Sequence, residues 1–283
     1  MPEITRDDVA DFHRRHVGAG GATVAVAGDL RDLDVPALVE ASLGGWASGD
    51  GPPTKALTTP ALLSEQRAGI VLVDRPGSVQ SELFVAGPGP DRSVDGGWAP
   101  YPVIAFVVGG SPTSRIDAVL REDKGYTYGL RSAFVPRRHG GQFVASGSVR
   151  ADATAESLRL LLDILVSPAQ GFSDKEIRSG VDFLRKTAPD RYATADAVAD
   201  EAVGMALDGR STSFTTDNLR DLATVDRARA EAAYRRFAEQ AGVAGSPGSP
   251  GEGWTVVVVG DAAEHLPAIE ALDLAPVSVV TQG

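Results

Sequence analysis

The chain contains no cysteine, only four histidines and no long apolar segment. Without cysteine it can form neither a disulfide nor a thiolate metal site. Its longest apolar runs, residues 103–108 and 256–259, are far shorter than the roughly 20 residues that a membrane-spanning helix needs. An excess of basic residues is also missing, since the formal net charge is -11. Nucleic-acid binding needs a basic face, so this charge argues against such a partner.

Length and composition are those of an ordinary globular protein. With 283 residues the chain has room for about two domains. Its hydrophobic fraction of 43% and charged fraction of 23% are typical of soluble proteins. Residues 1–8 are polar and acidic and lack the apolar stretch of a secretion signal. We therefore expect a soluble cytoplasmic protein.

A short pattern occurs twice, once near each end of the sequence. Residues 23–29 (TVAVAGD) are echoed by residues 255–261 (TVVVVGD). Each copy is typical of a short buried strand followed by a Gly-Asp turn and a helix, over residues 35–43 in one case and 265–272 in the other. This order is common in α/β proteins, but a helix with an Arg-Arg pair also precedes each copy, which favours a duplication.

The duplication predicts an unequal pair of domains. Residues 1–49 would be the tail of a first domain copy, residues 50–66 a Pro/Gly-rich linker, and residues 67–283 a complete second copy. One strand and two helices cannot bury a core, because a lone strand leaves its backbone groups unpaired. The tail must therefore dock on the second copy or be completed by another polypeptide.

The complete copy begins with strands, continues with helices and ends with a closing strand. Strands are expected over residues 70–74, 81–86, 126–135, 142–149 and 255–259. Helices are expected over residues 115–124, 155–165, 173–186, 194–207, 218–222 and 226–240. Residues 101–108 are almost wholly apolar and fit either a buried strand or a helix. This order predicts an α+β fold, with a largely antiparallel sheet and helices packed on it.

Residues 109–128 hold the most informative motif. Residues 109–114 (GGSPTS) lead into a helix, with Ser114 as its N-cap and Gly125 as its C-terminal stop. Arg121 lies on the last turn of this helix, and Tyr128 follows seven residues later on the next expected strand. This spacing can aim a guanidinium and a phenol at one point. Taken alone, the pair also fits a surface arginine and a tyrosine whose hydroxyl stays in water.

The chain resembles the non-catalytic half-domain of the insulinase, pitrilysin and mitochondrial processing peptidase family of zinc peptidases. The resemblance runs along the whole chain and rests on Arg121 and Tyr128 together with Gln80, Gly109-Gly110, Ser114-Arg115, Gly125, Gly140-Gly141 and the capping box Ser173-Asp174-Lys175-Glu176. It implies that Arg121 and Tyr128 hold the substrate backbone opposite a zinc site in the other half. The tyrosine hydroxyl would face the negative charge that builds on the attacked carbonyl oxygen, and the arginine would fix neighbouring carbonyls.

Tyr126 departs from the family pattern, which more often has an aliphatic residue there. It lies two residues from Tyr128 and so is expected on the same strand face. Either tyrosine could therefore be the one that contacts substrate.

The zinc motif of the family, His-x-x-Glu-His on a helix, is absent. His13 and His16 have a spacing that could share a metal, but the arginines between them favour an exposed helix surface. His265 is expected to be a capping or surface residue, and His139 lies in a basic turn. We expect no metal in this chain, and the resemblance places the zinc in the partner half.

Three functions remain open. The first is the substrate-binding, non-catalytic half or subunit of a zinc metallopeptidase acting on peptides, inactive alone and paired with a catalytic partner as a heterodimer. The second is a catalytically dead scaffold subunit of the same fold. The third is a small-molecule enzyme that uses the loop at Gly109-Gly110, whose backbone amides could bind an anion.

Overall fold

The computed structural model of the protein describes residues 4–47, 49, 69–137, 140–245 and 253–281. The chain divides into two compact units, Met1–Thr59 with Thr187–Phe214, and Pro60–Lys186 with Thr215–Gly283. The predicted linker, residues 50–66, lies outside the described residues, as does the expected domain start at residue 67. The division into residues 1–49 and 67–283 therefore stays a prediction. None of the helices in the described ranges is long and apolar enough to cross a membrane.

The first unit consists of short helices whose ends are set by capping side chains. They are α1 (Arg6–His16), α2 (Val35–Leu43), the 3₁₀ turn η5 (Pro189–Tyr192) and α6 (Ala195–Leu207). Thr5, Asp34 and Thr194 each accept a hydrogen bond from a backbone N–H of the first turn of α1, α2 and α6. None of these described helices has a buried residue, although each carries apolar side chains.

The predicted buried strand at residues 23–27 does not form within the described chain. These residues are assigned to no strand, and the side chains of Val24 and Val26 are 52% and 47% exposed. A strand is stable only where neighbouring strands accept and donate its backbone hydrogen bonds. The described residues supply no such neighbour. Residues 23–27 therefore have a sequence typical of a buried strand but no sheet to pair with among the described residues.

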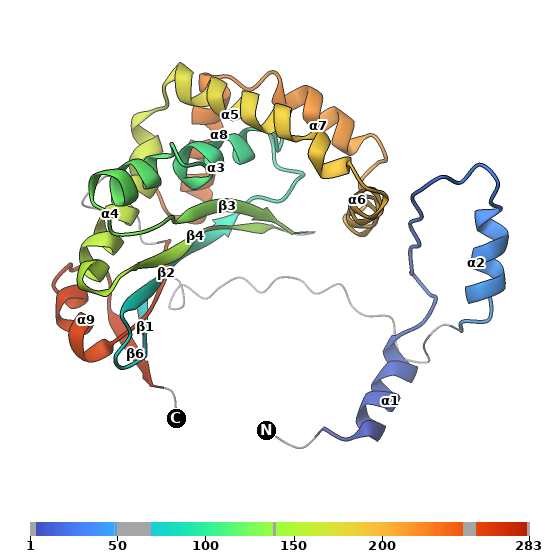
Figure 1. Ribbon diagram of the computed structural model, residues 1–283, viewed down its shortest axis with the longest axis horizontal. Coiled ribbons are helices and arrows are strands. Elements are labelled where there is room, and N and C mark those ends of the chain that lie inside the picture. Colours follow the sequence, from blue (N-terminus) through green and yellow to red (C-terminus); the bar gives the residue numbers. More distant parts are fainter. Residues whose placement is uncertain (1–3, 48, 50–68, 138–139, 246–252, 282–283) are drawn as a thin grey trace. The chain divides into compact units, whose positions relative to one another are not determined.

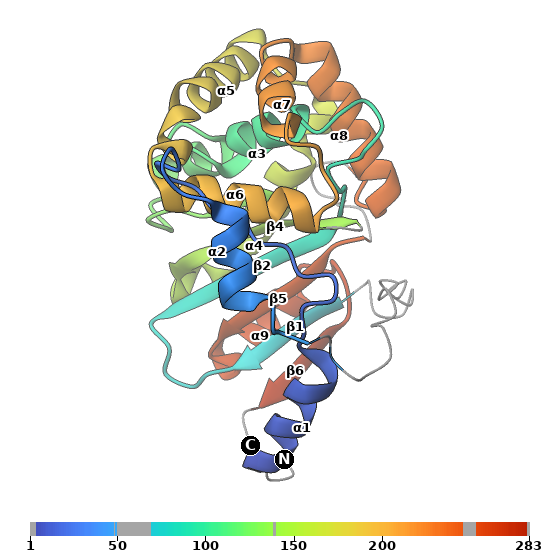
Figure 2. The ribbon, with the colours of Figure 1, turned by 90° about the vertical axis from the view of Figure 1, so that its right-hand side faces the viewer.

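The second unit is built around a six-stranded sheet with strand order β3-β4-β2-β5-β1-β6. The strands are β1 (Gly69–Asp74), β2 (Gln80–Gly89), β3 (Arg131–Pro136), β4 (Gly141–Arg150), β5 (Thr255–Gly260) and β6 (Val277–Thr281). The β3, β4, β2 and β5 contacts are antiparallel, whereas β1 pairs in parallel with both β5 and β6. Figure 2 shows β2, β5, β1 and β6 side by side.

Helices cover one face of this sheet (Figure 1). They are α3 (Pro100–Gly109), α4 (Thr154–Val166), α5 (Asp174–Thr187), α7 (Phe214–Leu222), α8 (Arg227–Ala241) and α9 (Ala262–Glu270). Successive strand residues alternate between the faces, so Leu83 and Val85 are buried while Phe84 is exposed. The α+β class and the antiparallel core of the sheet confirm the predicted fold.

Several predicted boundaries shift in the structure. Residues 101–108, which fitted a strand or a helix, lie in α3, where nearly every side chain is buried. The strand expected over residues 126–135 begins only at Arg131. The helix expected from His265 begins at Ala262, because Asp261 caps it by accepting from Ala263 N. β6 was not predicted at all.

Candidate functional site

The helix that carries Arg121 is a π-helix over most of its length. Ser114 accepts a hydrogen bond from Asp117 N, as expected of a cap, and η2 (Asp117–Asp123) then follows with the wider π turn. Lys124 N donates to Val119 O at 3.0 Å, five residues back. Gly125 ends the helix at φ +64°, as predicted. Such π segments are rare and often occur at functional sites.

Arg121 projects from this turn and is only partly free. Its side chain is 40% exposed, with Nη1 4.0 Å from Oδ2 of Asp117 and Nε 3.5 Å from Oε1 of Glu122. The carboxylate of Asp117 is fully buried, at 0% exposure, whereas that of Glu122 is exposed. The guanidinium therefore lies near a buried carboxylate while part of the side chain stays accessible.

Residues 126–130 form a pinned loop and not the first half of a strand. Tyr126 N donates to Leu120 O at 2.8 Å, and Tyr126 O accepts from Arg150 N at 2.8 Å. Thr127 Oγ1 donates to Ser148 O at 2.6 Å and accepts from Gly129 N at 2.9 Å. Backbone groups of this loop are thus bonded to the π-helix, to the end of β4 and to the Thr127 side chain, which explains why strand pairing starts only at β3.

Gly147 on β4 allows the loop to lie close to the sheet. A Cβ at this position would be 2.8 Å from the carbonyl oxygen of Gly129 and 3.0 Å from Cα of Leu130. The φ of Gly147, +159°, is also one that residues with a side chain rarely adopt. The absence of a side chain here therefore permits the loop, held by its hydrogen bonds, to approach β4 this closely.

The two tyrosines have different environments, so the prediction that they share a strand face is wrong. Tyr126 donates its hydroxyl hydrogen to Oε2 of Glu156 at 2.7 Å, and this hydrogen bond raises the pKa of Tyr126. Tyr128 is 92% exposed, and its hydroxyl has no hydrogen-bond partner within the described residues. The loop therefore presents one free phenol, that of Tyr128, from a fixed backbone.

A second arginine, Arg131, lies beside the same loop. Its Nη1 donates to Oδ1 and Oδ2 of Asp117, both at 3.1 Å, and to Leu130 O at 2.9 Å. Sequence reasoning singled out neither Asp117 nor Arg131, because they are fourteen residues apart and only the return of the chain into β3 brings them together. No local pattern could have indicated this pair.

Arg115, just before η2, ties the π-helix to the helical layer. Its guanidinium donates to Oε1 of Glu176 at 2.8 Å, to Ser167 Oγ at 3.0 Å and to Gly171 O at 2.8 Å. Glu176 also closes the predicted capping box with Ser173, which is confirmed. Burial alone would raise the pKa of Glu176, but the hydrogen bonds from Arg115 and Ser173 outweigh it and lower the pKa to about 2. The start of η2 is thus firmly anchored.

The glycines at the end of α3 serve close packing. A Cβ on Gly109 would lie 2.7 Å from Cδ1 of Ile116 and 2.9 Å from Ser132 Oγ, and one on Gly110 would lie 2.6 Å from Cα of Phe106. Side chains and backbone of the protein therefore fill the space around this loop. Packing alone explains both glycines without a bound anion.

The described histidines do not fit a zinc site. His13 and His16 lie on the exposed helix α1, where Asp11 pairs with both Arg14 and Arg15. His265 is buried in α9, so its predicted surface position is wrong, and His139 lies outside the described residues. In the described part of the chain, no three His, Cys, Asp or Glu side chains come together in a way that could hold a metal.

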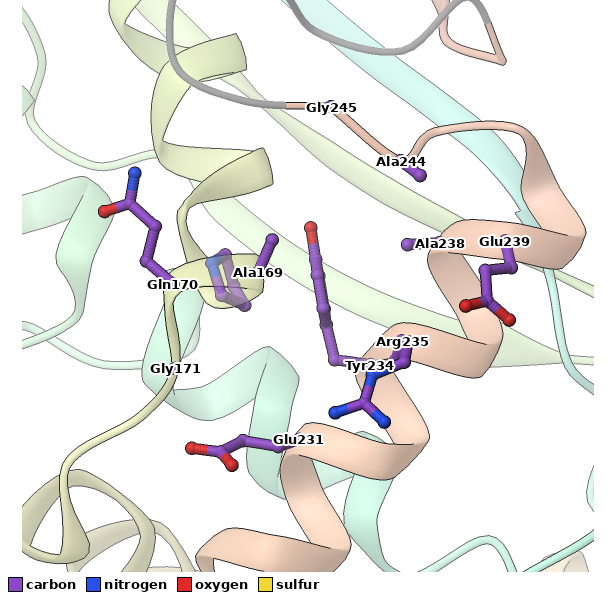
Figure 3. Close-up of a pocket in the computed structure, with 11 residues that line it drawn as sticks. Ala169, Gln170, Gly171, Glu231, Tyr234, Arg235, Ala238, Glu239, Ala244 and Gly245 are labelled. Carbon is purple, nitrogen blue, oxygen red and sulfur yellow. The ribbon is translucent and has the colours of Figure 1, made fainter.

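A separate hollow of about 300 Å³ lies between η4 (Ser167–Gln170) and α8. Figure 3 shows Tyr234 standing in it, between Ala169 on one side and Glu239 on the other. Burial raises the pKa of Tyr234, whose hydroxyl donates to a backbone carbonyl of α4 at 2.9 Å. The lining residues include none from η2 or from the loop of Tyr128, so this hollow is not part of the Arg121/Tyr128 site.

Comparisons with known proteins point to one family. The family profile described as the peptidase M16 inactive domain matches residues 3–184. The structure of a peptidase M16 inactive domain from Pseudomonas fluorescens matches 92% of this chain, with a TM-score of 0.73 and 22% identity. A protease from Helicobacter pylori matches 91% of the chain, with a TM-score of 0.72 and 14% identity. The periplasmic protease PqqL from Escherichia coli matches 80%, with a TM-score of 0.58 and 14% identity.

These structural matches establish a shared fold and also show a difference in length. The chain covers 58% of the Pseudomonas fluorescens protein, 59% of the Helicobacter pylori protein and 24% of the Escherichia coli protein. Among curated protein sequences, none matches the chain significantly. Each of these relatives therefore contains a large portion for which this chain has no counterpart.

Proposed function

Because this chain belongs to peptidase family M16 and is an inactive C-terminal domain of that family, we propose that it is the substrate-binding half of a zinc peptidase that acts on peptides. A separate catalytic half would carry the zinc. The observation that supports this most directly is Tyr128, a 92% exposed phenol on a loop whose backbone is hydrogen-bonded on both sides. An exposed side chain on a rigid backbone is what a preorganised hydrogen-bond donor requires.

The chemistry of peptide hydrolysis suits such a donor. Attack on the scissile carbonyl moves negative charge onto its oxygen, and a fixed O–H aimed at that oxygen lowers the barrier without reorganising. The hydroxyl of Tyr128 would serve this role, since that of Tyr126 is already donated to Glu156. The guanidinium of Arg121, supported by Asp117, would bind carbonyl oxygens of the substrate backbone.

Two features support the need for a partner. The sequence has no His-x-x-Glu-His motif, and the described residues offer no group of side chains that fits a zinc ion. The first unit also exposes residues that belong in a core. In the repeat, Val24 and Val26 correspond to Val256 and Val258, which are buried on β5 between β1 and β2. A sheet supplied by the catalytic half would give residues 23–27 the neighbours that β5 has.

One observation favours a scaffold as the second candidate. The guanidinium of Arg121 lies 4.0 Å from Asp117 and 3.5 Å from Glu122 of its own helix, so its charge has partners without a bound peptide. In a scaffold subunit these pairs would stabilise η2 only, and Tyr128 would be an ordinary surface residue. The two functions make opposite predictions for substitutions at Tyr128.

The test uses the tagged chain isolated together with the zinc-motif protein that binds it. With Tyr128→Phe, peptide turnover should fall by about 10²–10³, the loss seen when one oxyanion donor is removed. Arg121→Ala should mainly raise KM, because its contacts form before the transition state. Tyr126→Phe is the matched control and should retain turnover. Full activity in all three variants would support the scaffold, and a loss confined to Tyr126→Phe would assign the role to Tyr126.

A further inference from the structure

The site contains a guanidinium that the proposed function does not use. We propose that Arg131 is a second substrate-binding arginine, and that it selects peptides carrying a carboxylate next to the segment bound by Arg121 and Tyr128. Asp117 would act as its positioning residue. This inference rests on the proposed function and adds to it a class of substrate, peptides with an acidic side chain or a free C-terminal carboxylate at this point.

The hydrogen bonds of Arg131 leave one edge of its guanidinium available. Nη1 makes all three contacts, two with the carboxylate of Asp117 and one with Leu130 O. Within the described residues, Nε and Nη2 have no partner, and the side chain is 51% exposed. The Nε–Nη2 edge presents two parallel N–H groups, the geometry that matches a carboxylate with two hydrogen bonds.

The guanidinium lies directly against the loop that carries Tyr128. A Cβ on Gly129 would be 3.0 Å from Nη1 and 3.1 Å from Nη2 of Arg131. The planar group therefore rests on the residue next to Tyr128, in space that only a glycine leaves open. A peptide bound along residues 128–129 would therefore lie next to this arginine.

One buried carboxylate, that of Asp117, lies between two guanidiniums, those of Arg131 and Arg121. Asp117 is the only carboxylate paired with Arg131 in the described structure, and it is shared with Arg121, whose Nη1 is 4.0 Å away. Arg121 has Glu122 as a further partner, at 3.5 Å. The fully buried carboxylate of Asp117 holds Arg131 by hydrogen bonds, lies near Arg121 and is not itself accessible to a ligand. Arg131 is the more tightly paired of the two arginines, but all its bonds to Asp117 use Nη1, so its Nε–Nη2 edge keeps its N–H groups for a ligand.

The net charge of the chain provides an internal control. At -11 the protein as a whole repels anions, so its overall field gives no advantage to acidic peptides. A preference for a carboxylate would therefore report a local contact. Direct hydrogen bonding should also make this preference less sensitive to salt than long-range attraction would be.

The experiment measures peptide binding to the isotope-labelled chain by NMR, following the arginine Nε–H signals. Two peptide pairs separate the two sources of carboxylate. N-acetyl-Ala-Glu-Ala-amide is compared with its Gln counterpart, and N-acetyl-Ala-Ala-Ala with a free C-terminus is compared with its amide. We expect the acidic member of one pair to bind about tenfold more tightly, as one charge-assisted hydrogen-bonded contact allows. Equal affinities within both pairs would overturn the inference.

Variants of Asp117 and Arg131 test which residue is responsible for the preference for acidic peptides. Arg131→Gln should abolish the preference, and Arg131→Lys should restore at most part of it because lysine lacks the two-N–H edge. Asp117→Asn should weaken the preference, and because Asp117 also supports Arg121 it should lower the affinity for the neutral peptides as well. The double variant Asp117→Asn/Arg131→Gln leaves no buried charge unpaired, and its loss of preference should equal that of Arg131→Gln alone. A preference that survives in Arg131→Gln or in the folded double variant would refute the assignment.

The outcome also separates this inference from the proposed function. If neutral peptides bind and lose affinity in Arg121→Ala, but acidic peptides bind no better, only the role of Arg131 fails. If no peptide binds, and neither Arg121→Ala nor Tyr128→Phe alters activity with the catalytic partner, the proposed function fails together with the inference.

Discussion

The hydroxyl of Tyr126 donates a hydrogen bond of 2.7 Å to Oε2 of Glu156 on α4, whereas Tyr128, two residues further on, is 92% exposed. The hydroxyl of Tyr126 is engaged with the helical layer, whereas Tyr128 points into solvent from a loop whose backbone is held by other hydrogen bonds. One of two nearby tyrosine hydroxyls is thus hydrogen-bonded and the other is free, which makes the two residues a matched pair for mutation.

The first prediction concerns their effects on stability. Tyr126→Phe should lower the free energy of unfolding slightly, and Tyr128→Phe should leave it unchanged. The bond to Glu156 raises the pKa of Tyr126 above its ordinary 10.0, so its contribution is present below pH 10 and lost as the pH rises through the raised pKa. Urea unfolding at neutral and alkaline pH measures this. A difference between Tyr126→Phe and the parent that persists at high pH would contradict it.

The second prediction concerns the Arg115–Glu176 contact. Glu176→Gln removes the charge that accepts from Arg115 and Ser173 and should destabilise the chain by about 2 kcal/mol. The folded pKa of Glu176, about 2, lies below its ordinary 4.5, so this stability is present above pH 4.5 and lost as the pH falls towards 2. Thermal unfolding between pH 7 and pH 2 should show the variant and the parent converging.

Glu122→Gln is the control for this measurement. Glu122 is exposed and makes one contact of 3.5 Å with Arg121, so its loss should change stability by less than about 1 kcal/mol. If both variants were equally destabilised, the effect would come from general charge balance and not from the contact with Arg115.

The third prediction concerns the glycine beneath the loop. Gly147→Ala would place a Cβ 2.8 Å from the carbonyl oxygen of Gly129, and should destabilise the chain by about 1–3 kcal/mol. Because the loop must move, turnover with the catalytic partner should fall even where the protein stays folded. Gly204→Ala in α6 meets nothing within 4 Å and should stabilise by about 0.5–1 kcal/mol. Normal turnover in folded Gly147→Ala would show that the loop position is not critical.

The fourth prediction concerns the segment at residues 23–27. In the isolated chain its amides should exchange with solvent much faster than those of β5, which pairs on both sides with β1 and β2. Addition of the catalytic half should protect residues 23–27 and leave β5 unchanged. Hydrogen exchange with mass spectrometry resolves the two segments. Equal protection in a confirmed monomer would mean that the chain completes this strand by itself.

Features that depend on residues close together in the sequence could be predicted from the sequence alone. The capping box at Ser173 and Glu176, the cap at Ser114 and the stop at Gly125 all form as predicted, because each depends on residues within one helical turn. The family and the α+β class could also be predicted, because both predictions rest on the order and spacing of motifs along the sequence and do not need the tertiary contacts. The absence of the zinc motif likewise follows from the sequence alone.

Tertiary contacts decided the rest. Residues 101–108 form the helix α3, which the sequence could not predict. Because this helix is buried on nearly all sides, its apolar residues show no periodicity that would distinguish a helix from a strand. Residues 126–130 became a loop because Thr127 and Leu120 satisfy backbone groups that a neighbouring strand would otherwise bond. The π turns of η2 and the parallel strand β6 likewise depend on what lies beside them.

The Arg121/Tyr128 site shows most clearly which features the sequence predicts and which only the tertiary structure decides. The spacing of Arg121 and Tyr128 was visible in the sequence, but the pairing of Asp117 with Arg131 was not, because it joins a helix to a strand across a turn. The sequence by itself determined which donors exist and in what order they occur. Only the folded chain decided which carboxylate holds them, which hydroxyl is already engaged and which one remains free, since those properties belong to distances between residues that the sequence keeps apart.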